Sequence, residues 1–232
     1  MRSMPDENDT PPAADIARMF AAAVRRDPTR PLLTWYDDAS GERTELSGAT
    51  LDNWVHKTAN LLVDGAGLGD GDRAGVLLPP HWQTAAVLLG CWAAGVEVVT
   101  RPGGVDVLFA AAGRVGEARD WPAGEQYALA LAPLAAPLRE VPAGWQDYVV
   151  AVRAHGDVFP AYPRGAADHT PADPFGLNPG DRVLVDAARH PDPRHWLLAP
   201  LAAGASIVLC GNLDRAKLPD RLAAEQVTRD LS

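Results

Sequence analysis

Two repeating spacings of apolar residues divide the chain into predicted helices and strands. Apolar residues recur every three or four positions after Thr10, Ser47 and His81, which is the period of a helix with one buried face. Short apolar runs bounded by glycine and aspartate are typical of buried strands. We predict strands at residues 32–36, 43–46, 74–78, 96–100, 105–109, 127–131, 183–186, 206–210 and 226–231. Because helices alternate with these strands, the pattern predicts a three-layer α/β fold with mainly parallel sheets in two related lobes.

An internal repeat supports the two lobes. Residues 67–99 match residues 176–208 at 13 of 33 positions without a gap. The shared positions include Gly-Asp-Arg before a strand, a histidine after it, and Ala-Ala-Gly at the end of the next helix. Gly95 and Gly204 suit the left-handed position that ends a helix. We interpret the match as a duplicated unit; the alternative is convergence, since strand–helix–strand units share glycine at their turns.

The predicted organisation has four parts. Residues 1–12 form a disordered lead, residues 13–154 the first α/β lobe, and residues 176–232 the second, repeated unit. Residues 155–175 contain four prolines and no periodicity, so we predict a loop. Ser47 is expected to cap the helix that follows it.

The charge balance and the cysteine count exclude several function classes. The chain has 30 acidic and 21 basic residues and a formal net charge of −9, which disfavours nucleic acid as a partner. Cys91 and Cys210 are too few for a disulfide framework or a cysteine zinc site, and the six histidines show no metal-binding spacing. With no secretory leader and no apolar run long enough for a bilayer, we expect a cytoplasmic protein without metal or cofactor and without a membrane partner.

Several local motifs follow one another in an order known from one protein superfamily. They are Pro31-Leu32-Leu33-Thr34-Trp35, Thr44-Glu45-Leu46-Ser47, Ala59-Asn60-Leu61-Leu62, Gly71-Asp72-Arg73 and Leu88-Leu89-Gly90-Cys91-Trp92-Ala93-Ala94-Gly95. Residues 14–99 thereby resemble the start of the large domain of adenylate-forming enzymes, which include acyl-CoA synthetases and peptide-synthetase adenylation domains. Residues 176–209 resemble a later part of that domain. The resemblance covers about half of the chain and implies the superfamily's two-lobed α/β fold.

The chemistry that this resemblance implies is missing from the matching positions. Family enzymes carry a Ser/Thr/Gly-rich loop ending in Lys, which wraps ATP phosphates, where this chain has residues 155–175. That segment has no Lys, and Arg164 is its cation. Asp157, Asp168 and Asp173 would repel phosphate. The family's metal-binding motifs and C-terminal catalytic Lys would lie beyond Ser232, so the resemblance implies a truncated and degenerate relative.

Two classes of function follow from these observations. We expect a non-catalytic binding or interaction module; the alternative is an acyl- or AMP-binding enzyme, or half-enzyme, completed by a partner chain. No catalytic residue is assigned. His190 is the candidate ligand-binding residue, because it follows the strand at residues 183–186, at the end where ligands bind α/β sheets. The resemblance places a family histidine within one position of it, although a surface or helix-capping histidine would fit the same sequence.

Association is also expected from the shortened chain. If later segments of the family fold are absent, the apolar surface that they would cover is exposed to solvent. Large exposed apolar patches are rare in monomers. We therefore expect a homodimer or a protein partner, with the patch formed by residues 196–201 or 213–222.

Overall fold

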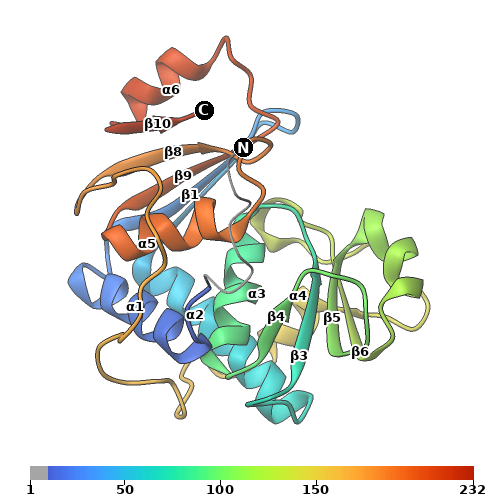
Figure 1. Ribbon diagram of the computed structural model, residues 1–232. Coiled ribbons are helices and arrows are strands. Elements are labelled where there is room, and N and C mark those ends of the chain that lie inside the picture. Colours follow the sequence, from blue (N-terminus) through green and yellow to red (C-terminus); the bar gives the residue numbers. More distant parts are fainter. Residues whose placement is uncertain (1–9) are drawn as a thin grey trace, which may run out of the picture.

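Two five-stranded sheets enclose a layer of helices (Figure 1). The computed structural model describes residues 10–232. Sheet A has the strand order β10-β8-β9-β1-β2, and sheet B has the order β4-β3-β5-β6-β7. The strands are β1 (Pro31–Asp37), β2 (Glu42–Ser47), β3 (Arg73–Leu77), β4 (Glu97–Val99), β5 (Val105–Ala111), β6 (Ala123–Leu129), β7 (Gln146–Asp147), β8 (Arg182–Asp186), β9 (Ser206–Gly211) and β10 (Arg229–Leu231). Every pairing is parallel except β1 with β2, so the predicted fold class is confirmed.

The helices lie mostly between the sheets. Figure 1 shows α1, α2, α3 and α5 in this inner layer and α6 on the outer side of sheet A. The α-helices are α1 (Ala13–Arg26), α2 (Gly48–Asn60), α3 (Trp82–Ala93), α4 (Tyr148–Arg153), α5 (Ala199–Ala203) and α6 (Leu218–Ala224). Four further helical turns are η2 (Leu61–Gly65), η3 (Ala112–Asp120), η4 (Pro133–Ala135) and η5 (Arg194–Leu198). Among residues 10–232, none of these helices combines the length and apolar character that crossing a bilayer requires.

Sheet A combines the two ends of the chain. Leu33 of β1 pairs with Ile207 of β9, and Thr34 pairs with Val208. The hairpin of β1 and β2 therefore lies in the sheet of the C-terminal unit, although the sequence places it in the lobe of residues 13–154. The hairpin thus lies on the other side of the predicted boundary between the two lobes. Strands so far apart in the sequence pair according to how their apolar faces pack, and no local sequence signal indicates that pairing.

The two matching segments have the same local geometry. The backbone N–H of Glu97 donates to Asp72 O at 2.8 Å, and that of Ser206 donates to Asp181 O at 2.9 Å. Gly95 and Gly204 have φ of +80° and +73°, as predicted for left-handed positions after a helix. Each segment runs from a strand through an inner-layer helix to a parallel neighbouring strand. This agreement is what a duplication predicts, and common ancestry of the two units stays an inference.

Local signals also fix the start of α2 and the course of the connecting loop. Ser47 Oγ accepts a hydrogen bond from Thr50 N at 3.2 Å, so the predicted cap is confirmed. Residues 155–175 contain no helix or strand, as the proline content predicts. Of the predicted disordered lead, residues 1–9 lie outside the described residues, and Pro12 directly precedes α1.

The expected association patch is absent from the surface. Trp196 and Leu197 are fully buried in the core between the sheets, and Leu201 is 2% exposed. Leu213, Leu218 and Leu222 are partly buried against Leu184 and Val208 on the outer face of sheet A. The prediction of an exposed patch at residues 196–201 or 213–222 is therefore wrong, because the chain covers both stretches itself.

Candidate functional site

Residues 155–158 are held against α2 through their backbone carbonyl groups. Lys57 Nζ donates to His155 O at 2.7 Å. Asn60 Nδ2 donates to Gly156 O at 2.8 Å and to Val158 O at 2.9 Å. These bonds engage three carbonyl groups within four residues of the segment with two side chains of one helix. They fix the course of the segment through its backbone, and its own side chains take no part in these three bonds.

Asp15 of α1 anchors the second half of the same segment. Its carboxylate accepts hydrogen bonds from the backbone N–H groups of Asp168 and His169, each at 3.1 Å. His169 Nδ1 lies 2.9 Å from Asp15 Oδ2, and Arg18 pairs with Asp15 Oδ1 at 3.0 Å. The contact with His169, followed by the backbone donors, lowers the pKa of Asp15 to about 2. Tyr162 adds a bond to α1, since its hydroxyl donates to Ala17 O at 3.1 Å.

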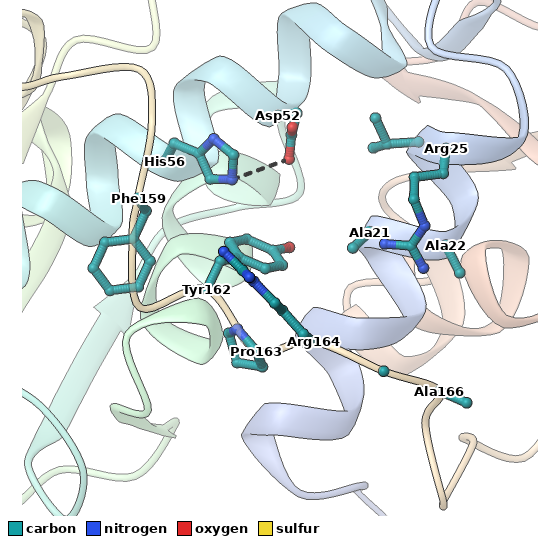
Figure 2. Close-up of a pocket in the computed structure, with 12 residues that line it drawn as sticks. Ala21, Ala22, Arg25, Asp52, His56, Phe159, Tyr162, Pro163, Arg164 and Ala166 are labelled. Atoms are coloured by element: carbon teal, nitrogen blue, oxygen red, sulfur yellow. Dashed lines mark ion pairs between the residues drawn. The ribbon is translucent and has the colours of Figure 1, made fainter.

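A cavity of about 680 Å³ remains between α1, α2 and this segment. Figure 2 shows the guanidinium of Arg25 on the α1 side of this space and that of Arg164 across from it, beside Tyr162 and His56, with Asp52 on α2. The volume lies in the range of small-molecule sites. The lining residues are Ala21, Ala22, Val24, Arg25, Asp52, His56, Phe159, Tyr162, Pro163, Arg164, Gly165 and Ala166.

The polar wall of the cavity is an aspartate–histidine pair. His56 Nε2 lies 3.6 Å from Asp52 Oδ1, one helical turn away. His56 Nδ1 lies 3.0 Å from Asp157 O; because a carbonyl can only accept, this nitrogen carries the proton. Burial raises the pKa of Asp52, and His56 partly offsets that rise. The backbone carbonyl of Asp157 and the carboxylate of Asp52 thus lie beside the two ring nitrogens, an arrangement that orients the ring.

The aromatic wall is formed by the partly buried His56 and Tyr162 and the buried Phe159. The rings of His56 and Tyr162 meet edge to face, with centroids 4.9 Å apart. Phe159 is 6% exposed. Burial, together with the negative charge of Asp52, raises the pKa of Tyr162, so its phenol stays protonated at neutral pH. Since that proton is donated to Ala17 O, Tyr162 presents the cavity with ring surface and not with a free hydroxyl.

His190 lies elsewhere, at the end of β8. Its backbone N–H donates to Asp186 O at 3.0 Å, which places it at the strand exit predicted from the sequence. Its ring contacts Phe175 at 5.5 Å and His195 at 6.1 Å between centroids. Burial and the nearby His195 lower the pKa of His190. Neither His190 nor the two rings that it contacts line the cavity. Its role as a ligand-binding residue stays a prediction.

No metal site accompanies these residues in the described part of the chain. Over residues 10–232, no group of three or more His, Cys, Asp or Glu side chains is arranged to hold a metal ion. Sequence reasoning named Arg164 as the cation of residues 155–175 but missed the other polar residues of the cavity. The spacing of four between Asp52 and His56 was the one signal for them, and it is common on helix surfaces.

Comparison with known proteins places this geometry in a family. The model of the family described as AMP-binding enzyme matches residues 20–104. A Mycobacterium tuberculosis protein named "TIGR03089 family protein" is 41% identical over 242 residues, which cover 96% of this chain and 100% of that protein.

Solved acyl-CoA synthetases share the fold. The Brucella canis acyl-CoA synthetase superposes with a TM-score of 0.69 at 19% identity, over 92% of this chain and 46% of that chain. The acetoacetyl-CoA synthetase from Streptomyces lividans gives a TM-score of 0.67 at 19% identity, over 91% of this chain and 41% of its own. This chain therefore spans less than half the length of these two enzymes. It belongs to the TIGR03089 family of its mycobacterial relative. Its residues 20–104 match the AMP-binding enzyme family, and its fold is that of part of the acyl-CoA synthetases.

Proposed function

We propose that this chain is a non-catalytic relative of the AMP-binding enzymes that acts as a binding module. The supporting observation is the state of residues 155–175, which stand where the resemblance expects the phosphate-binding loop. Asp15, Lys57 and Asn60 hold this segment against α1 and α2 through its backbone. Its own backbone N–H groups at Asp168 and His169 donate to a carboxylate, so they are not available to a phosphate.

The cations support the same proposal. The chain has only two lysines, and both are engaged. Lys57 donates to His155 O, and Lys217 pairs with Asp38 at 3.4 Å. Removing one preorganised charge stabiliser costs an enzyme roughly 10² to 10³ in rate, and adenylation needs several of them.

The test is carboxylate-dependent exchange between ATP and pyrophosphate. We expect the purified chain, with Mg²⁺ and a broad panel of carboxylic acids, to give no exchange above a heat-inactivated sample. A full-length acyl-CoA synthetase assayed in parallel shows that the conditions permit the reaction. Steady exchange by the chain alone, proportional to its concentration, contradicts the proposal.

The second candidate is an enzyme completed by a partner chain. Two observations favour it: the chain spans less than half of the solved synthetases, and His190 lies at the strand end where α/β folds bind ligands. Exchange activity that appears only after adding a protein captured from the source cell's lysate supports this candidate. Both proposals assign the protein to the cytoplasm, where the buried free thiols of Cys91 and Cys210 are stable.

A further inference from the structure

The cavity between α1, α2 and residues 159–166 is positively charged in a strongly acidic protein. Four side chains that can carry a charge line it: Arg25, Asp52, His56 and Arg164. Both arginines stay charged at any relevant pH. Whatever protons Asp52 and His56 carry, these four groups sum to a charge between +1 and +3. The whole chain has a net charge of −9, so this sign is local.

The remaining lining is apolar and leaves room for a ligand. Val24 and Phe159 are buried beneath the space, and the ring of Tyr162 packs beside them. Alanines at positions 21, 22 and 166 and Gly165 contribute little bulk. An apolar floor with a few charged groups at its edge is the usual composition of a small-molecule site.

We infer that this cavity binds a small organic oxyanion with an apolar body, its charged end between Arg25 and Arg164 and its body against Val24, Phe159 and Tyr162. The inference rests on the proposed binding function and names its ligand class. Arginine is suited to this role because its planar guanidinium offers paired donors to carboxylate or phosphate oxygens. The aspartate–histidine pair fits as well: Asp52 is a single carboxylate beside His56 and cannot cancel the charges of two guanidinium groups.

The two guanidinium groups are exposed and carry no anchoring role that would be lost by substitution. Residue 164 is held through its carbonyl oxygen, which accepts from Arg18 Nε at 3.0 Å, and not through its own side chain. Arg25 is exposed near the end of α1. Replacing either guanidinium should therefore leave the fold intact and change ligand binding alone.

The experiment uses three probes that share a 4-fluorophenyl ring, with the full chain. They are 4-fluorobenzoate, 4-fluorophenyl phosphate and the neutral 4-fluorobenzamide, titrated by calorimetry and by ¹⁹F and ¹H–¹⁵N NMR. We expect at least one of the anions to bind and the amide to bind at least about tenfold more weakly. The benzoate and phosphate arms distinguish a carboxylate from a phosphate ester as the preferred oxyanion. Amide shifts should centre on Gly165 and Ala166.

Variants locate the binding. Arg25→Gln and Arg164→Gln should each weaken anion binding by about tenfold, since a charge-assisted hydrogen bond is removed. Arg119→Gln, an exposed arginine on η3 away from the cavity, makes the same change of net charge and should have no effect. Ala21→Leu should weaken 4-fluorobenzoate but not acetate, because it fills the space for the apolar body.

Each contrary result overturns the inference. Equal binding of the amide shows that charge is not recognised, and full binding by both arginine variants shows that the ligand sits elsewhere. Absence of binding by all three probes at millimolar concentration also refutes the site. These outcomes are independent of the ATP–pyrophosphate assay, so a failed site and a failed non-catalytic proposal are distinguishable.

Discussion

Asp15 and His169 lie 154 positions apart in the sequence, and their side chains meet at 2.9 Å. The same carboxylate also accepts from the backbone of residues 168 and 169, so one residue of α1 fixes the end of the long loop. Because these contacts lower the pKa of Asp15 to about 2, the carboxylate favours the folded state above about pH 4. This contribution is lost as the pH falls through about 2.

Replacing this carboxylate should loosen the loop. In Asp15→Asn we expect the amides of residues 168 and 169 to exchange with solvent about tenfold faster, because a neutral amide accepts fewer and weaker hydrogen bonds. Hydrogen exchange followed by NMR or mass spectrometry measures this. Asp168→Asn is the control, since the backbone and not the side chain of Asp168 bonds to Asp15. Unchanged exchange in Asp15→Asn would show that the loop is held by its other contacts.

The buried His81 should make stability depend on pH. Burial lowers the pKa of His81 to about 3, and the charge of Asp37 offsets only part of this shift. His81 Nδ1 accepts from Gln83 N at 3.1 Å, so protonation would also break the cap of α3. In the unfolded chain a histidine titrates near pH 6.5. Between pH 6.5 and 3 only the unfolded state binds this proton, so the free energy of unfolding should fall by about 1.4 kcal/mol per pH unit.

Urea unfolding at pH 6.0, 5.2 and 4.5 measures this slope. His81→Asn keeps a capping acceptor but has no titrating group, so most of the slope should disappear. His190, whose pKa is also lowered, contributes in the same direction, and His190→Asn should therefore remove only a minor part. A slope that survives in His81→Asn would mean that His81 is protonated in the folded protein.

The buried Glu225 should be essential for stability. Its carboxylate bonds to Tyr36 Oη at 2.6 Å, to Arg43 at 2.9 Å and to Arg182. Burial would raise the pKa of Glu225, but these three donors lower it to about 2. Glu225→Gln removes the charged partner of Arg182 and one of the two charged partners of Arg43, so we expect a loss of about 3 kcal/mol in denaturant unfolding.

An exposed carboxylate in the same cluster supplies the matched control. Glu45 pairs with Arg43 at 2.6 Å, but the side chains of Arg43 and Glu45 are 45% and 35% exposed. Glu45→Gln should therefore cost less than about 1 kcal/mol. Similar losses in the free energy of unfolding for the two variants would show that the burial of Glu225 does not determine its contribution.

The close approach of α2 and α3 requires glycine at position 90. A Cβ atom there would lie 2.5 Å from Thr58 Cβ and Cγ2, and Thr58 is fixed by a bond to Tyr148. We expect Gly90→Ala to lower the free energy of unfolding by about 2 kcal/mol in spite of the better helix propensity of alanine. Gly103→Ala has open space around it and should stay within about 0.5 kcal/mol of the parent. Thermal and urea unfolding of both variants tests the contrast.

Local signals in the sequence predicted what depends on neighbouring residues. Ser47 caps α2 and Gly95 ends the turn after α3, because both roles follow from the chemistry of one residue at a helix end. The placement of the β1–β2 hairpin in sheet A has no such signal. It depends on which apolar face meets β9, and only the assembled core decides that.

The cavity lay beyond sequence reasoning for a related reason. Arg25, Asp52 and Arg164 come from three segments that meet only because residues 155–175 pack along α1 and α2. The bonds that hold this segment run mostly to backbone atoms, which have no pattern in the sequence. The resemblance to adenylate-forming enzymes directed attention to the end of β8 instead, where His190 lies.

The pairing of β1 with β9 also determines the order of events during synthesis. Leu33 and Trp35 leave the ribosome well before their partners Ile207 and Leu209, which follow them by 174 positions. Until then one edge of the hairpin is unpaired, and such edges invite pairing with other chains. Sheet A can close only after translation has passed β9. The nascent protein must therefore keep this hairpin from aggregating until residues 206–211 have been made.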